Sequence, residues 1–177
     1  MTDIAHPAAP WWRSLPVAIF DKINALCAVI PYAVIGLAVR IIMARVFFLD
    51  GQGKIEGKSV LVDLTNFSFS ITLPEKVKSE TFEIFQTKFA AVPLPPNFSA
   101  NFVSYAEFFL PILLVLGFFT RISAAILLVM TIVIQVYVLP EALWTVHVYW
   151  AALLLVLMTV GPGAVSIDRL IGFLSGR

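Results

Sequence analysis

Cysteine and histidine are scarce in this 177-residue chain, and their scarcity excludes several kinds of chemistry. Cys27 is the only cysteine, so the chain has no intrachain disulfide, no CxxC redox pair and no thiolate cage for a metal. Of the two histidines, only His147 falls in a long apolar segment, which excludes a haem held between two membrane histidines. The sequence has no HExxH motif, phosphate-binding glycine loop or serine triad. We therefore expect no metal site and assign no catalytic residue.

Charged residues are also few, and their charges nearly cancel. They make up 13% of the chain and leave a net charge of +1, which offers no basic field for a nucleic-acid backbone. Hydrophobic residues account for 60% of the chain, more than a soluble globule of this size can cover with polar surface. Nucleic acid is therefore excluded as a partner, and the lipid bilayer is expected to be part of the protein's solvent.

Several apolar segments have the length of a membrane-spanning helix. A hydrocarbon core of about 30 Å is crossed by about 20 helical residues, and we predict spans over residues 31–49, 101–119, 122–139 and 143–160. The connectors FTRIS and LPEALW are short, so the last three spans are expected to be sequential antiparallel neighbours. The sequence therefore predicts an all-α membrane protein, a four-transmembrane-helix bundle.

Residues 50–100 differ in kind from the spans and are predicted to form a loop outside the membrane. They carry five lysines and six acidic residues. SVLVDL and FSFSITL are strand-like, with Thr65 and Asn66 between them as a turn, which favours a small β-hairpin. A short amphipathic helix is predicted to follow from Pro74, with an apolar side made of Val77, Phe82, Phe85 and Phe89.

The two ends of the chain are predicted to lie on the same side of the membrane. Residues 1–30 are expected to form a tail and an interfacial lead-in helix from Val17, and residues 161–177 a second tail. Lysine and arginine gather on this side in short connections, whereas the turn near Glu141 has none. Because such residues favour the cytoplasm, both termini are expected to be cytoplasmic and the loop extracytoplasmic.

The few polar side chains within the spans hold most of the functional information, because an ionisable group near the bilayer centre costs several kcal/mol unless it is partnered or hydrated. Counted along each helix, they fall in one layer toward the loop side: Arg40, Arg45, Glu107, Gln135 and His147. We hypothesise that Glu107 pairs with Arg45 or Arg40, and that Gln135 and His147 extend the pair into a polar pocket. Aromatic residues at similar depth would wall this pocket: Tyr105, Tyr137, Trp144, Tyr149 and Trp150.

Such a pocket suits a small polar molecule or the head of a quinone. A structural alternative stays open. A Glu–Arg pair can lock two helices together, both arginines can extend their charged ends to the membrane surface, and His147 can cap an aromatic belt.

Five short motifs, in their order and spacing, resemble the DoxX family of small bacterial membrane proteins over residues 30–171. Arg40 is followed by the FF pair at 47 and 48, Gly51 and Lys54. The other motifs are EFFLPILLVLGFFTR from Glu107, MTIVIQ from Met130, LWTVHVYWA from Leu143 and GPGAVSID from Gly161.

The resemblance implies a four-helix protein of the bacterial inner membrane. Relatives are linked to quinone-coupled sulfur oxidation, as in thiosulfate:quinone oxidoreductase subunits, to oxidative-stress assemblies and to metal-handling gene clusters. The first hypothesis is therefore a non-catalytic membrane subunit or anchor of a redox or stress-response complex, with a protein partner at the loop. The second is a quinone-binding oxidoreductase subunit, and the third a transport or maturation factor for a small molecule or metal. No intrinsic cofactor is expected, a quinone is the candidate ligand, and a homo-oligomer stays open.

Overall fold

The computed structural model describes residues 17, 19–25, 31–64 and 67–175. Four segments in it are long and apolar enough to cross a membrane. Three are single helices, α2 (Tyr32–Lys54), α4 (Pro96–Leu116) and α5 (Thr120–Tyr137). The fourth is a continuous segment made of the 3₁₀ turn η1 (Pro140–Ala142), the π-helical turn η2 (Leu143–His147) and α6 (Val148–Thr159). The predicted all-α membrane protein with four spans is thus confirmed.

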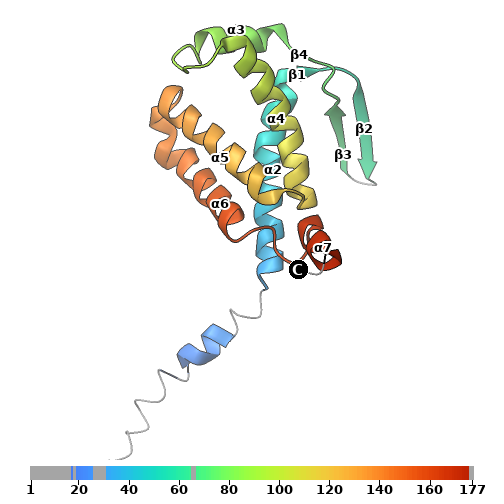
Figure 1. Cartoon of the computed structure of the whole chain (residues 1–177), viewed down its shortest axis with the longest axis vertical. Coiled ribbons are helices and arrows are strands. Elements are labelled where there is room, and N and C mark those ends of the chain that lie inside the picture. Colours follow the sequence, from blue (N-terminus) through green and yellow to red (C-terminus); the bar gives the residue numbers. More distant parts are fainter. Residues whose placement is uncertain (1–16, 18, 26–30, 65–66, 176–177) are drawn as a thin grey trace, which may run out of the picture.

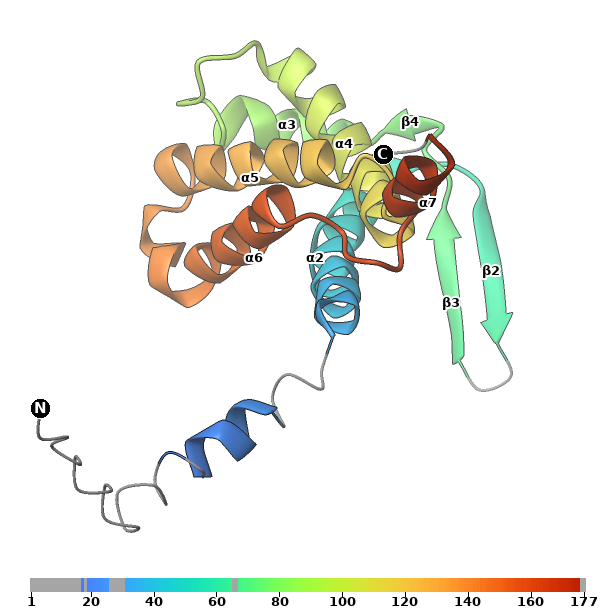
Figure 2. The ribbon, with the colours of Figure 1, turned by 60° about the horizontal axis from the view of Figure 1, so that its bottom comes forward.

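The four spans pack as a ring around one apolar core. α4 contacts α2 and α5, and α6 contacts α5 and α2; the pairs lie side by side in Figures 1 and 2. The fully buried members of the core come from all four spans: Met43, Leu114, Ala124, Leu127, Leu154 and Leu157. Many other apolar side chains face outward, which suits a surface covered by lipid tails.

The loop between α2 and α4 contains most of the remaining secondary structure. Strands β2 (Ser59–Leu64) and β3 (Phe67–Thr72) form the predicted antiparallel hairpin, whose turn at residues 65–66 lies outside the described residues. β1 (Ile55–Glu56) pairs with β4 (Lys76–Val77), and α3 (Ser79–Thr87) follows. The predicted loop helix therefore starts at Ser79 and not at Pro74, because the residues between them pair as a strand. Of its predicted apolar side, Val77 and Phe85 are buried.

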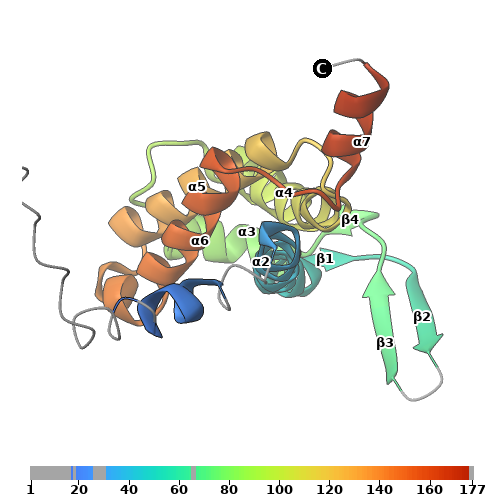
Figure 3. The ribbon, with the colours of Figure 1, turned by 90° about the horizontal axis from the view of Figure 1, so that it is seen from below.

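The loop elements and the C-terminal helix mark opposite ends of the bundle, as Figure 1 shows. We call the end with α3 and the β-pairs the loop end, and the end with α7 (Ile167–Leu174) the tail end. Figures 1 and 3 both show the β2–β3 hairpin standing away from the helices. Residues 17 and 19–25 are helical, within the predicted lead-in helix, and residues 26–30 lie outside the described part.

A fully buried arginine holds the tail end together. The Arg40 guanidinium donates hydrogen bonds to the Val165 carbonyl at 2.5 Å and to the Val115 carbonyl at 3.4 Å. Asp168 accepts from the backbone N–H groups of Phe119 at 2.8 Å and Thr120 at 3.0 Å. These are orphan donors at the start of α5, so a carboxylate there is stabilising. The GPGAVSID motif is thereby fixed to the turn between α4 and α5.

Candidate functional site

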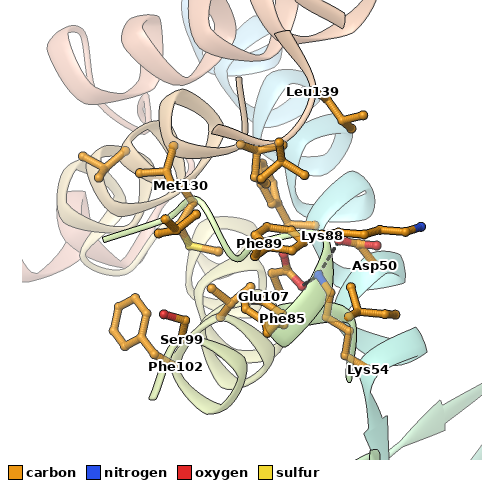
Figure 4. A pocket seen from close by; sticks show the side chains of 18 of the residues that line it. Asp50, Lys54, Phe85, Lys88, Phe89, Ser99, Phe102, Glu107, Met130 and Leu139 are labelled. Atoms are coloured by element: carbon orange, nitrogen blue, oxygen red, sulfur yellow. Dashed lines mark hydrogen bonds and ion pairs between the residues drawn. The ribbon is translucent and has the colours of Figure 1, made fainter. Parts of the chain in front are cut away.

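A cavity of about 900 Å³ lies at the loop end, between α2, α3, α4, α5 and the start of α6. Its volume is within the usual range for small-molecule sites, about 300–1,000 Å³. Most of its wall is apolar, and the aromatic part of that wall consists of Phe47, Phe85, Phe89, Phe98, Phe102 and Trp150. Figure 4 shows Phe85 of α3 and Phe89, two residues after α3, over the same space that Glu107 reaches from α4.

An ion-paired chain of three side chains lies in the wall between α2 and α4. The Lys54 ammonium donates to the Asp50 carboxylate at 2.6 Å and to Oε2 of Glu107. The exposed fraction falls along this chain, from 63% for the Asp50 side chain through 18% for Lys54 to 1% for Glu107. Oε1 of Glu107 is buried and has no hydrogen-bond partner among the described residues. Figure 4 shows the Lys54 amine between the two carboxylates.

The ion pair between Lys54 and Glu107 can form because α2 and α4 lie very close together. A Cβ added at Gly51 would lie 2.9 Å from Cβ of Glu107 and 3.0 Å from its carbonyl oxygen. Pro111, inside α4 and four residues after Glu107, has no N–H to donate to that carbonyl. Gly51 therefore sits against an interruption of the α4 hydrogen-bond ladder, and the next turn of α2 brings Lys54 to the carboxylate.

A buried histidine forms the opposite wall. Nδ1 of His147 lies 2.7 Å from Oε1 of Gln135, and the Gln135 amide nitrogen donates to the Pro140 carbonyl at 2.7 Å. Because the amide nitrogen is a donor, Oε1 is the acceptor and His147 Nδ1 carries a proton, which leaves Nε2 as the acceptor of the neutral ring. The His147 ring lies 5.5 Å from the Trp150 ring. His147 closes the single turn of π-helix, a feature frequent at functional sites.

Three further polar side chains line the cavity. Ser99 is buried, and its hydroxyl has no partner among the described residues. Arg45 and Lys88 are exposed and border the cavity from α2 and from the residue after α3. The cavity thus combines an apolar interior with cationic groups at its rim. Its wall holds a hydroxyl and a carboxylate oxygen that no other described residue binds.

The structure brings together some of the predicted site residues. Arg45, Glu107, His147 and Trp150 line the cavity, and Gln135 is hydrogen-bonded to His147. The predicted pairing of Glu107 with Arg45 or Arg40 is wrong, since its partner is Lys54. Arg40 does not belong to this layer. It lies 14 residues before Lys54 on α2, about 21 Å along the helix, and serves the tail end.

The predicted aromatic wall is largely absent from the cavity. Trp144 is 75% exposed and Tyr149 62% exposed, and neither lines it. Tyr105 lies outside it too and lines a separate apolar groove of about 440 Å³ on the α4–α5 surface. Within the described residues, only Trp150 of the five predicted aromatic residues reaches the cavity.

The family model for DoxX matches residues 35–140, more than half of the chain. This chain belongs to the DoxX family. The match in this DoxX protein includes the Asp50–Lys54–Glu107 chain and Gln135, while His147 follows it. No curated protein and no solved structure is significantly similar to the DoxX chain.

Sequence reasoning missed Lys54, Asp50 and Ser99 as parts of this DoxX site. A usable signal was present: Asp50 and Lys54 are spaced one helical turn apart, directly after a long apolar helix. The predicted span ends at Leu49, so Asp50 and Lys54 fall in the predicted loop and outside the set of polar side chains within the spans. Phe85 and Phe89 were assigned to an apolar helix side, but no sequence feature connects that side with a cavity.

The polar groups of the site suit an organic ligand. In the part of the chain that the structure describes, no three His, Cys, Asp or Glu residues are grouped so that they could hold a metal ion. An ammonium, a carboxyl, an imidazole and a hydroxyl around an apolar space suit a ligand with a polar head and a hydrophobic body.

Proposed function

We propose that this DoxX protein is a membrane subunit that holds a quinone in the loop-end cavity on behalf of a redox or stress-response complex. The observation that carries the proposal is Oε1 of Glu107, a buried oxygen with no hydrogen-bond partner in the described part of the chain, in the wall of a large apolar cavity. Burying a polar atom without a partner costs free energy. A ligand head that bonds this oxygen would recover that cost.

The chemistry of the wall suits the two redox states of a quinone head. Carbonyl oxygens of the oxidised form accept hydrogen bonds, which the Ser99 hydroxyl and the rim cations Arg45 and Lys88 supply. Hydroxyl groups of the reduced form donate, and Oε1 of Glu107 and Nε2 of His147 accept. The aromatic wall accommodates the ring and the start of its hydrocarbon tail.

Electron transfer requires a partner, and the hairpin favours one at the loop end. Alternation along the strands places Val60, Val62, Phe69 and Ile71 on one face of the hairpin. Its other face carries Ser59, Asp63, Ser68, Ser70 and Thr72, with Leu61 the one apolar residue among them. An amphipathic hairpin that stands away from the bundle is suited to binding a protein. The proposal places the protein in the bacterial inner membrane, with cytoplasmic termini and the loop end outside.

Binding of a quinone can be measured by quenching of Trp150 fluorescence. The chain has four tryptophans, and replacing Trp11, Trp12 and Trp144 by Phe leaves the one that lines the cavity. A benzoquinone with a decyl tail is expected to quench this residue saturably. Val133→Phe, in the cavity wall, should weaken binding at least about tenfold, or about 1.4 kcal/mol.

Val136→Phe is the matched control on the same helix, because Val136 is 58% exposed and does not line the cavity. It should bind as the parent does. Quenching that never saturates, or that both Phe variants leave unchanged, would refute the proposed quinone site.

A further inference from the structure

We propose that Asp50, Lys54 and Glu107 form a proton connection between water at the loop end and the interior of the cavity. The three side chains are joined by continuous hydrogen bonds. Their side-chain exposure falls from 63% to 18% to 1% in the same order. A chain with one exposed end and one buried end has the geometry that proton transfer requires.

The exposed end of the chain faces water. Asp50 lies in the last turns of α2, which continues directly into β1. Next to β1, Lys76 of β4 forms an ion pair with Glu56 at 2.8 Å, and their side chains are 74% and 44% exposed. Charged side chains are rarely exposed to lipid because of the energetic cost, so a pair this exposed indicates that this end of the bundle faces water.

The buried end of the chain faces the cavity. All three side chains line the cavity, and Glu107 is the buried one: it uses Oε2 for Lys54, while Oε1 has no partner among the described residues. A proton received on Oε2 becomes available to whatever occupies the cavity when the carboxyl turns about its Cγ–Cδ bond and the two oxygens exchange places.

The proton that Lys54 gives to Glu107 is replaced from water through Asp50. Lys54 gives one ammonium proton to Oε2 of Glu107, which breaks an N–H bond and forms an O–H bond. The resulting amine takes a proton from the Asp50 carboxyl, which water has protonated. Lys54 and Asp50 end as they began, and one proton has moved from water to Glu107.

Other charged or titratable groups surround this chain without forming hydrogen bonds to it. Arg45 of α2, Lys88 after α3 and His147 of η2 line the same cavity. None of them makes an ion pair with Glu107 or Asp50 among the described residues. These groups contribute to the electrostatic potential around the chain, while the hydrogen-bonded route for the proton runs through Lys54.

Infrared spectroscopy of the ligand-free protein in lipid nanodiscs tests the connection. The carboxyl band of Glu107, assigned by its loss in Glu107→Gln, is followed after transfer to D₂O. Asp50→Asn keeps an acceptor for Lys54 but cannot relay a proton. Exchange at Glu107 should slow at least about tenfold in this variant, equivalent to a barrier raised by about 1.4 kcal/mol.

Asp63→Asn is the control, an exposed carboxyl on the hairpin outside the cavity lining; exchange should stay at the parent rate. Equal exchange in parent and Asp50→Asn would overturn the connection, as would a Glu107 that never protonates across the range in which the protein stays folded. The inference deepens the proposed quinone function, yet this measurement uses no quinone. Failure of quinone binding and failure of the proton connection are therefore separate results.

Discussion

Gly51 is the residue that allows α2 and α4 to meet at the site. Its missing side chain leaves room for the backbone and Cβ of Glu107, which a Cβ would approach to 2.9 Å. Gly53, two residues later, has nothing within 4 Å of an added Cβ. Glycine inside a helix lowers stability by about 0.5–1 kcal/mol relative to alanine. Both glycines carry this cost, but only Gly51 lies against another helix.

Exchanging each glycine for alanine separates these surroundings. Gly51→Ala should destabilise the protein by about 1–3 kcal/mol, because the helices must shift to relieve the contact. Gly53→Ala should raise stability by about 0.5–1 kcal/mol. Thermal unfolding in detergent measures both changes. If Gly51→Ala were as stabilising as Gly53→Ala, the close packing at Glu107 would be contradicted.

The hairpin formed by β2 and β3 is the element that carries the proposed contact with a protein partner. Its base is closed by a backbone hydrogen bond from Leu73 to the Lys58 carbonyl at 2.8 Å. The Gln52 side chain binds both backbone groups of Thr72, accepting from its N–H at 2.7 Å and donating to its carbonyl at 3.2 Å. The hairpin can therefore be shortened without disturbing its anchor.

Replacing residues 60–71 by an Asn-Gly turn between Ser59 and Thr72 keeps that base and removes the apolar face. Co-purification of the partner should be lost, while quenching of Trp150 by the quinone stays unchanged. Leu61→Ser alters only the opposite face, at a side chain that is 77% exposed, and should retain the partner. A partner that still binds the shortened protein would show that it docks elsewhere.

Elements were predictable from the sequence where one local rule dominates. The spans follow from the length and composition that a bilayer requires, and the hairpin follows from alternation in FSFSIT. The end of α2 was not predictable in this way, because contacts of Gln52 and Lys54 with distant segments extend the helix through two glycines. Likewise, nothing near Arg40 in the sequence indicates that Val165 accepts its hydrogen bond.

At the scale of the whole molecule, the two ends of the bundle differ in what they hold. The tail end is closed by hydrogen bonds between backbone groups and the side chains of Arg40 and Asp168. The loop end contains the cavity, the ion-paired chain and the hairpin. A bundle built in this way has one end available for chemistry, and its orientation in the membrane decides which compartment that end faces.

Cysteine labelling determines this orientation. In a Cys27→Ser background, Ser79→Cys at the start of α3 and Ser175→Cys after α7 place one exposed thiol at each end. A membrane-impermeant maleimide should label the first variant in intact cells and the second only after permeabilisation, because the loop end is expected outside. The reverse pattern would place the loop end in the cytoplasm and contradict the proposed orientation.

Gln52 and Lys54 belong to the same turn of α2, and this shared position links two parts of the molecule mechanically. One side chain holds the base of the hairpin, and the other holds the carboxylate of the cavity. A displacement of the hairpin base that rotated this turn would therefore also move the Lys54–Glu107 ion pair. If the proposed partner docks on the hairpin, this turn of α2 is the route by which occupancy of the cavity would reach it.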